Sequence, residues 1–346
     1  MIEIDGSLGE GGGQVLRSAL TLAVMTGQPM RITNIRARRK KPGLQAQHLA
    51  AVNAAAAISG AEVEGAHLGA SELRFQPGAV RPGDYRFDIG TAGAASLVLQ
   101  TIFLPLGLAA GPSEVTIIGG THVPWSPCFH YLDLQWLPFM HRIGFDTTLE
   151  LLLAGFYPQG NGQIRARIEP IKTIAPLDLP ERGGLKGIRG ISAVANLDMS
   201  IAERQRKRAL NRLQGRHNRI DIELLDLPAR AKGTCLLLQA EFKRSSACYF
   251  GLGALGKRAE QVADEACLWL EKFLATNGAV DEYLADQLLL PLAFAEGPSE
   301  YRTAKVTPHL LTNAEIIRMF DVATIEIEDD SGKSGLVRIT PGSKKP

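Results

Sequence analysis

The alternation of hydrophobic and polar positions predicts a chain built from short strands and amphipathic helices. Ile2 to Asp5 alternates apolar and polar side chains like a half-buried strand, and the next segment places its apolar residues on one helical face. The order strand, helix, strand, helix, strand, strand covers about 2–80 and recurs over about 84–168. Pieces of a third copy follow residue 170. The pattern therefore predicts an α/β (α+β) fold with three βαβαββ repeats.

A differently composed block, from about 184 to 276, interrupts the third copy. Its strands and two helices predict an inserted small α/β domain. The large repeat domain would then comprise 1–183 and 277–340, and 341–346 would be a frayed tail. The block holds a basic group that fits an RNA-phosphate surface, although a solvated helix face is the simpler interpretation. This group comprises Arg204, Arg206, Lys207, Arg208, Arg212, Arg216 and Arg219.

The repeats place different polar side chains at equivalent positions. Each first helix ends in a turn with a proline, and the residues twelve positions before these prolines are Arg17, Gln100 and Asp286. If the three copies pack around a common axis, these side chains point to one place. The loops after the next strands would join them, and these loops hold the basic run from Arg36, the segment 122–127 and His309.

Composition narrows the class of protein. The 346 residues favour two domains, and 45% hydrophobic with 21% charged residues is ordinary for a globular chain. The net charge of +2 argues against bulk electrostatic binding of nucleic acid, so an RNA partner would depend on local basic clusters. Four scattered cysteines without a C-x-x-C pair argue against a zinc site and a disulfide framework. With no membrane-length apolar run, we expect a soluble, cytoplasmic protein, and the basic run leaves nuclear targeting open.

Two loops near the N-terminus have the composition of phosphate-binding loops. The glycine-rich turn 6–13 leads into a helix, where backbone N–H groups and the helix dipole favour an anion. Glu10 in this turn would repel a phosphate unless a divalent cation stood between them, so it is either a metal contact or a solvated residue. The run 36–41 holds five basic residues and is either a phosphate-binding loop or a solvated charge run.

His309 is the most reactive candidate. It follows a strand-like run, and Thr312 with Glu315 forms a capping box that predicts a helix starting at Thr312, with His309 in the loop before it. An imidazole there can act as a base, a metal ligand or a nucleophile, whereas a histidine beside leucines is more often structural.

These segments together resemble the RNA 3′-terminal phosphate cyclase family over nearly the whole chain. The matching stretches are Asp5-Gly6, Gly9 to Gln14, Arg17-Ser18, Ile35 to Ala37, Arg39, Lys41 to Leu44, Gln47 to Leu49, Gly155 to Pro158, Glu282 to Gln287 and His309 to Asn313. Two positions of the family's glycine signature differ, because Ala154 stands before Gly155 and Asn161 replaces a glycine. The family fold combines βαβαββ units, related to those of enolpyruvyl transferases, with a small inserted domain.

The resemblance implies ATP-dependent conversion of an RNA 3′-phosphate end to a 2′,3′-cyclic phosphate. His309 would carry AMP as a phosphoramidate, and the adenylate would pass to the RNA phosphate before the 2′-hydroxyl displaces AMP. Glu10 would hold Mg²⁺ or Mn²⁺. The residues expected near ATP or the RNA end are Gln14, Arg17, Arg36, Arg39, Gln47, Gln100, Pro127, Phe250, Tyr283, Leu284, Ala285, Asp286 and Gln287.

Three other functions are compatible with parts of this pattern. A catalytically silent cyclase-like scaffold in ribosomal RNA processing would lack the nucleophile, so His309 counts against it. An enolpyruvyl transferase would need six repeats, more than this length allows, and the balanced charge disfavours a plain RNA-binding module. The sequence does not indicate an oligomeric state.

Overall fold

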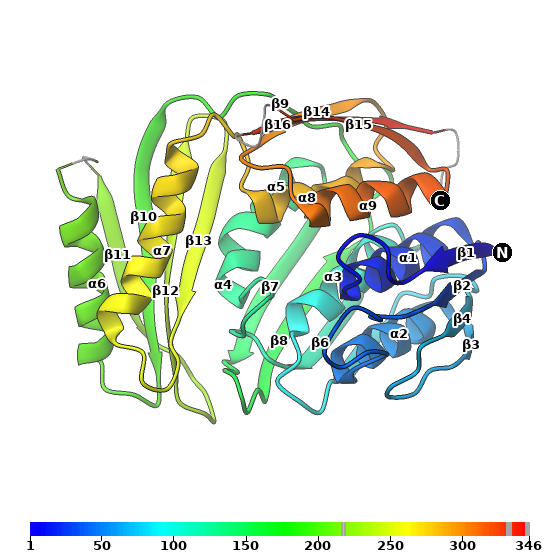
Figure 1. Cartoon of the computed structure of the whole chain (residues 1–346), viewed down its shortest axis with the longest axis horizontal. Coiled ribbons are helices and arrows are strands. Elements are labelled where there is room, and N and C mark those ends of the chain that lie inside the picture. Colours follow the sequence, from blue (N-terminus) through cyan, green and yellow to red (C-terminus); the bar gives the residue numbers. More distant parts are fainter. Residues whose placement is uncertain (216, 218, 330–333, 343–346) are drawn as a thin grey trace.

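A computed structural model of the protein describes residues 1–215, 217, 219–329 and 334–342, and it contains three mixed sheets with the same strand order (Figure 1). The first has the order β1-β2-β4-β3, with β1 and β2 parallel and the other neighbours antiparallel. Parallel neighbours need a crossover, which the first helix supplies. The elements are β1 (Ile2–Asp5), α1 (Gly13–Thr26), β2 (Met30–Thr33), α2 (Ala46–Ser59), β3 (Glu62–Glu64) and β4 (Leu73–Gln76).

The second unit repeats this arrangement with the order β5-β6-β8-β7. Its second helix is replaced by two short α-helices joined through a π-helical turn, η1. The elements are β5 (Asp84–Asp88), α3 (Ala95–Gly107), β6 (Ser113–Gly119), α4 (Phe129–Tyr131), η1 (Leu132–Trp136), α5 (Leu137–Arg142), β7 (Asp146–Leu153) and β8 (Gly162–Glu169).

The third unit has the order β9-β14-β16-β15, again with its first pair parallel. Its first strand precedes the inserted block and the rest follows it, which confirms the interrupted third repeat. The elements are β9 (Asp178–Leu179), α8 (Glu282–Leu292), β14 (Ser299–Thr303), α9 (Pro308–Met319), β15 (Ala323–Asp329) and β16 (Gly335–Pro341). Strand β16 includes Pro341, the first residue of the expected tail 341–346, and 343–346 lie outside the described residues.

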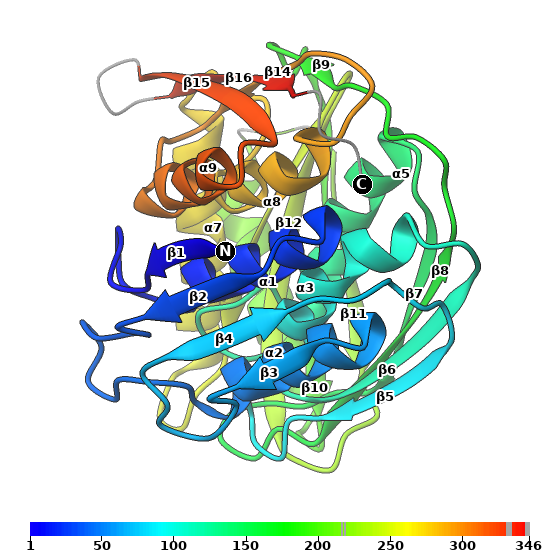
Figure 2. The same cartoon turned by 90° about the vertical axis from the view of Figure 1, so that its right-hand side faces the viewer.

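The helices of the three units pack against one another and the sheets lie outside them (Figure 2). Contacts join α1 to α2, α3 and α9, and α2 to α3, and α8 to α9. One hydrophobic core runs through all three units. The predicted packing around a common axis is therefore present, and it brings the N-terminal halves of several helices together.

The inserted block forms a fourth sheet, with the order β11-β10-β12-β13 and two helices on one face (Figure 1). Its elements are β10 (Leu185–Ala195), α6 (Ser200–Leu213), β11 (Ile220–Asp226), β12 (Gly233–Phe242), β13 (Ser246–Leu252) and α7 (Ala259–Leu274).

The arginines of α6 mostly have partners within the protein. Arg208 pairs with Asp264 of α7 at 2.9 Å. Arg204 pairs with Glu260 of the same helix, and Arg212 pairs with both Asp264 and Glu271. The basic helix face is therefore largely a helix–helix contact, which neither of the two sequence interpretations included. Arg216 lies outside the described residues. Among the described residues, no helix combines the length and apolar character needed to cross a membrane.

Candidate active site

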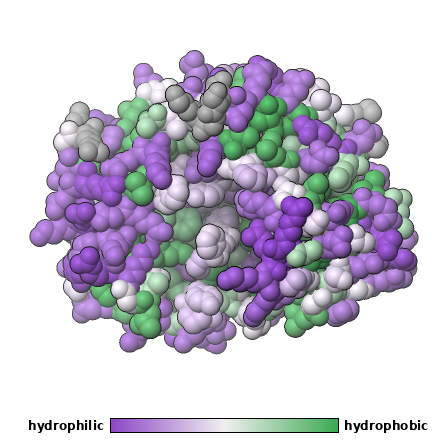
Figure 3. All heavy atoms as spheres, viewed as in Figure 1, coloured by the Kyte–Doolittle hydropathy of each residue, from purple (hydrophilic) through white to green (hydrophobic). Residues whose placement is uncertain are grey.

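A cleft of about 730 Å³ lies between the repeat units and the inserted sheet. Figure 3 shows the hollow between the inserted part on the left and the repeats on the right. Arg17 of α1, Gln100 of α3 and Asp286 of α8 all line it. The equivalent repeat positions therefore do meet at one place, as the spacing predicted.

His309 lies on the first turn of α9, at the edge of this cleft. The N-cap is Thr307, whose hydroxyl accepts from the Leu310 N–H at 3.1 Å, and Pro308 occupies the first helical position. The expectation of a helix starting at Thr312 is wrong, because Thr312 lies one turn inside and its hydroxyl donates to the Pro308 carbonyl. Thr-Pro is itself a helix-start signal, since proline lacks an N–H that the first turn would leave unpaired. His309 is consequently held by a helix and not by a loop.

The imidazole of His309 faces a carboxylate. Its Nε2 lies 3.2 Å from Oε2 of Glu10, and Arg39 donates to the same oxygen at 3.3 Å. The pKa of His309 lies below its usual value, mainly because the ring is partly removed from water. Glu10 opposes this shift, while the charges of Arg17 and Arg39 add to it. The ring is therefore neutral at pH 7, the form that has a nucleophilic nitrogen.

The glycine turn packs closely against α9 and against Arg39, the two parts of the chain that contact Glu10. Gly9 has φ +57°, and a Cβ built there would lie 2.0 Å from Oγ1 of Thr312 in α9. A Cβ on Gly12 would lie 2.8 Å from a guanidinium nitrogen of Arg39. At Gly9 the positive φ and the short distance both require glycine, whereas at Gly12 the tip of Arg39 would have to shift. The glycines thus bring the arginine loop and the His309 helix to the start of α1.

Arg36 contributes to the site indirectly. Its guanidinium donates to the carbonyls of Lys41 and Gly43, and its backbone φ is +55°. Arg38 similarly donates to the Gly9 carbonyl at 3.1 Å. Arg36 therefore shapes the loop that carries Arg39, and the structure does not place it on the cleft wall.

Arg17 and Asp286 form the buried end of the cleft. Burial lowers the pKa of Arg17 to about 10, so the guanidinium stays charged at neutral pH. Burial likewise raises the pKa of Asp286 to about 7, against the opposing charge of Arg17. Arg17 also donates to Oε1 of Gln14 at 3.2 Å, and Asn313 donates to the Asp286 carbonyl. A charged, incompletely neutralised arginine therefore faces the cleft.

Other residues that line the cleft carry amide and aromatic side chains. Gln100 donates to Oε1 of Gln287 at 2.7 Å, and Gln287 donates to the Tyr283 carbonyl. Pro127 and Phe250 line the same cleft. This combination of flat apolar surfaces with amide groups is typical of a site for a nitrogenous base.

Six expected site residues do not line the cleft: Glu10, Arg36, Arg39, Gln47, Leu284 and Ala285. Glu10 and Arg39 lie beside His309 at the cleft edge. Leu284 and Ala285 are fully buried within α8. Gln47 lies beside the second unit, where its side chain accepts from the Ala94 N–H at 2.8 Å. Leu284 and Ala285 are buried although Tyr283 and Asp286 beside them line the cleft, because adjacent residues of a helix point in different directions. Asn161 has φ +57°, a glycine-like conformation that asparagine tolerates.

The inserted block supplies cleft residues that the sequence did not indicate. Lys257 and Trp269 line the cleft, and Tyr249 donates to Glu282 at the N-terminus of α8 at 2.5 Å. These residues lie far from the repeat motifs in sequence, so only the folded chain shows that they belong to the same wall.

Glu10 fits a small divalent cation. Mg²⁺ is usually held by one or two carboxylates together with substrate phosphates. The Glu10 carboxylate is one-third exposed and points to the cleft edge beside Arg39 and His309. Glu10 is therefore the residue here that could hold a cation arriving with a nucleotide.

Comparison with known proteins shows the family of the chain. The family model for RNA 3′-terminal phosphate cyclase matches residues 8–327. The chain belongs to the RNA 3′-terminal phosphate cyclase family. This confirms the resemblance seen in the sequence.

Curated relatives with that name match over nearly their whole length. The protein of Nostoc punctiforme is 47% identical over 95% of this chain and 97% of its own. Those of Methylococcus capsulatus and Methanopyrus kandleri are 43% and 42% identical, over 98% and 99% of this chain and 96% and 99% of theirs.

One solved structure has a weak likeness to the chain. The enolpyruvyl transferase NikO from Streptomyces tendae matches with a TM-score of 0.29 and 17% identity, over 55% of this chain and 34% of that chain. This level of similarity carries no argument about fold or function.

Proposed function

We propose that the chain converts the 3′-phosphate end of RNA to a 2′,3′-cyclic phosphate with ATP, through AMP bound covalently to His309. The observation that carries the proposal is the position of His309. Its neutral imidazole lies on the first turn of α9, at the edge of a cleft with Arg17 and Gln100 on its walls. Family membership supports the reaction class.

In the first step, a ring nitrogen of His309 attacks the α-phosphorus of ATP. The N–P bond forms, the bond from the α-phosphorus to the bridging oxygen breaks, and pyrophosphate leaves. Nε2 faces Oε2 of Glu10, an acceptor, so the proton lies between them in this arrangement. Attack by Nε2 requires this proton on Nδ1 instead. When Glu10 ceases to accept from Nε2, the ring can adopt that tautomer.

The cationic groups around His309 stabilise charge on the phosphates. Arg39 and His309 contact the same Glu10 oxygen, at 3.3 and 3.2 Å, and Arg17 lines the same cleft as His309, so both guanidinium groups are placed to act on a phosphorus bonded to the imidazole. The N-termini of α1 and α9 both lie at the cleft edge beside His309, and their free N–H groups favour an anion. Fixed donors aimed at developing charge typically contribute about 3–4 kcal/mol each.

A divalent cation held by Glu10 would neutralise phosphate charge and favour departure of pyrophosphate. Glu10 cannot offer Oε2 to this cation and to the Nε2–H of His309 equally. Binding of the metal–nucleotide pair is thus linked to release of the imidazole.

The second and third steps use the same cleft. An oxygen of the RNA 3′-phosphate attacks the phosphorus of the adenylate, the N–P bond breaks, and His309 leaves as an imidazole. The 2′-hydroxyl then attacks the RNA phosphorus, its proton passes to solvent, and AMP leaves. Pro127 and Phe250 lie on the wall proposed for adenine, and base stacking contributes about 1–3 kcal/mol.

The catalytically silent scaffold is the alternative function, and covalent labelling distinguishes the two. The protein is incubated with a divalent metal and ATP labelled at the α-phosphate, and the protein-bound label is tested for acid lability. We expect acid-labile label on the wild type and none on His309→Ala. His67→Ala is the matched control, because His67 is an exposed histidine that does not line the cleft. Label that persists in His309→Ala would identify another nucleophile, and no label with any metal would favour the scaffold.

We also propose the division into a repeat domain at 1–183 and 277–340 and an inserted domain at 184–276. All four cysteines are free thiols in the structure, which agrees with the intracellular, cytoplasmic location that we propose.

A further inference from the structure

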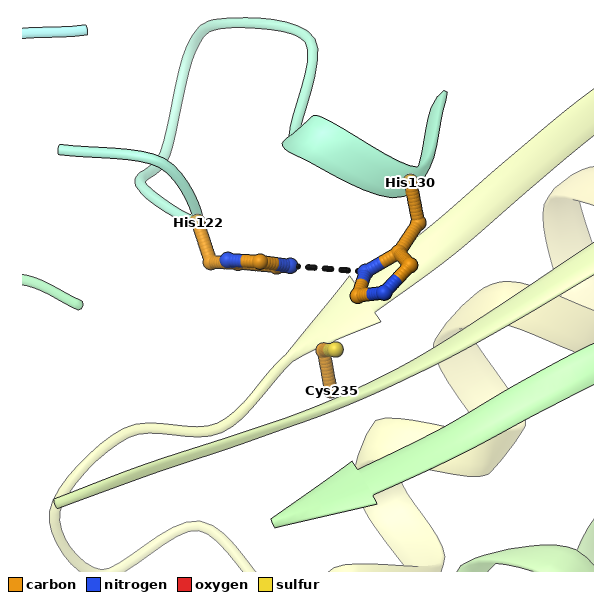
Figure 4. A group of neighbouring side chains, drawn as sticks. All are labelled: His122, His130 and Cys235. Carbon is orange, nitrogen blue, oxygen red and sulfur yellow. Dashed lines mark hydrogen bonds between the residues drawn. The ribbon is translucent and has the colours of Figure 1, made fainter. Parts of the chain in front are cut away.

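Two histidines and a cysteine from distant segments meet behind the cleft. His122 follows β6, His130 lies on α4, and Cys235 lies on β12 of the inserted sheet (Figure 4). All three are buried, and their ligand atoms lie within 4.8 Å of one another. Two imidazole nitrogens and one sulfur are the donor set that Zn²⁺ prefers.

We propose that His122, His130 and Cys235 bind a Zn²⁺-class transition-metal ion that joins the second repeat to the inserted sheet. Spacing alone argued against zinc, because it shows no C-x-x-C pair. The signal was missed because Cys235 is more than a hundred residues from either histidine in sequence. The site is separate from Glu10 and does not depend on the proposed reaction.

The geometry requires only a small adjustment. Nε2 of His122 and Nδ1 of His130 are 2.9 Å apart and share a hydrogen bond. Two nitrogens bound tetrahedrally at Zn–N distances of about 2.0–2.1 Å are about 3.3 Å apart. The rings therefore need to separate by about 0.4 Å. The sulfur, which lies within 4.8 Å of the nitrogens, would have to come to about 3.6 Å from each of them, and side-chain torsions can supply both shifts.

Thr121 can fix the required tautomer. Its hydroxyl oxygen lies 2.8 Å from Nδ1 of His122 and accepts from the Gly155 N–H at 2.9 Å. In the metal-bound form Nδ1–H of His122 donates to this oxygen, which leaves Nε2 for the ion; a second partner of this kind is typical of metal-binding histidines. His130 keeps its proton on Nε2, and the Cys235 thiol loses its proton to solvent. Binding therefore forms two N–Zn bonds and one S–Zn bond and releases one proton.

Burial of the three side chains affects metal binding in two opposite ways. Burial raises the pKa of the Cys235 thiol, so the free protein holds it protonated, and it lowers the pKa of both imidazoles, so they are neutral. A bound cation deprotonates a coordinating thiol outright. Three protein ligands leave one position of a tetrahedral ion for water.

The site would anchor both ends of a loop that lines the cleft. His122 and His130 flank the segment 123–129, and Pro124 to Pro127 within it line the proposed nucleotide wall. Cys235 belongs to a small apolar cluster with Phe156, and the Phe156 ring stacks on His122 at 4.9 Å. A bound ion would therefore fix the loop against the inserted sheet.

The test measures metal on the intact protein. Wild type, Cys235→Ala and Cys267→Ala are stripped with a chelator, dialysed with Zn²⁺ and measured by elemental analysis, and then loaded with Co²⁺ for absorption spectra. Cys267 is the matched control, because it is also a buried free thiol but is not part of the cluster. We expect one tightly bound ion per chain in wild type and Cys267→Ala, with a thiolate-to-cobalt charge-transfer band. Loss of a second-sphere partner costs about 10–100-fold in affinity, so loss of Cys235 should cost at least about 100-fold and abolish the band.

Equal Zn²⁺ content in Cys235→Ala and wild type would overturn the proposal, as would a wild-type cobalt spectrum without the charge-transfer band. Thr121→Val is the second variant: it retains all three ligands and should weaken Zn²⁺ about 10–100-fold. Unchanged affinity in Thr121→Val would exclude the assigned tautomer. Circular dichroism of each variant verifies the fold, and the ATP-labelling reaction is a separate measurement whose failure leaves the metal content unaffected.

Discussion

Replacement of Gly9 by alanine tests whether the glycine turn positions the His309 helix. The new Cβ would lie 2.0 Å from Oγ1 of Thr312, whereas ordinary contacts begin at 3.4 Å. Thr312 is one helical turn after His309, so the overlap pushes directly on the helix that carries the imidazole. Overpacking of this kind costs about 1–3 kcal/mol, and the left-handed φ costs an alanine about 1–2 kcal/mol more.

The expected result is a loss of both stability and rate. The free energy of unfolding should fall by about 2–5 kcal/mol in Gly9→Ala. A displacement of roughly 1 Å at a reacting group can cost about 100-fold, so covalent labelling by ATP should slow by that order. Denaturant unfolding and the single-turnover labelling rate measure the two quantities.

Two further variants separate strain from overlap. Gly27→Ala has the same kind of φ, +66°, but its Cβ would meet no atom within 4 Å. It should therefore lose about 1–2 kcal/mol of stability and keep the wild-type labelling rate. Adding Thr312→Ala to Gly9→Ala removes the nearest atom and leaves a contact of 3.2 Å, so the rate should largely recover. A wild-type labelling rate in Gly9→Ala, or no recovery in the double variant, would refute the proposed coupling.

Three other variants test the roles of individual charges. Because only neutral His309 can attack, the labelling rate of the wild type should rise with pH through a pKa below the usual histidine value and then level off. Glu10→Gln removes the charge that raises this pKa, so the inflection of the labelling rate should move to lower pH. An inflection that stays in place or moves to higher pH would contradict this role of Glu10. Arg17→Met should slow labelling by about 100–1,000-fold while the far-ultraviolet spectrum is unchanged, and a loss below 10-fold in single-turnover assays would place Arg17 outside the phosphate site. Arg208→Ala should change the free energy of unfolding by about 0–1 kcal/mol and leave the salt dependence of RNA binding unaltered, because Arg208 already pairs with Asp264; a shallower salt slope would assign it to RNA.

The repeat was predictable because it depends on local patterns of hydrophobic and polar residues. Strand and helix periodicity depends on neighbouring residues, and it placed Arg17, Gln100 and Asp286 at equivalent positions before their meeting in the cleft was visible. The start of α9 was misplaced because the sequence holds two valid helix-start signals, Thr307-Pro308 and Thr312 with Glu315. Propensity cannot choose between them when the chain supplies both.

Side-chain partners were less predictable than elements. Arg36 lies in a basic run of the kind that binds phosphate, yet its guanidinium donates hydrogen bonds to carbonyls of its own loop. The basic face of α6 meets carboxylates more than fifty residues away in sequence, and Cys235 meets its histidines in the same way. These contacts depend on the packing of the inserted sheet, for which a single sequence holds no local signal.

Mapping of the adenylylated residue tests the central claim most directly. The protein is incubated with ATP and a divalent metal, digested at neutral pH to preserve a phosphoramidate, and analysed by tandem mass spectrometry. The account predicts a mass increase of one AMP on the peptide that contains His309, with fragmentation that places it on the imidazole. AMP on a lysine or on any other histidine would contradict it.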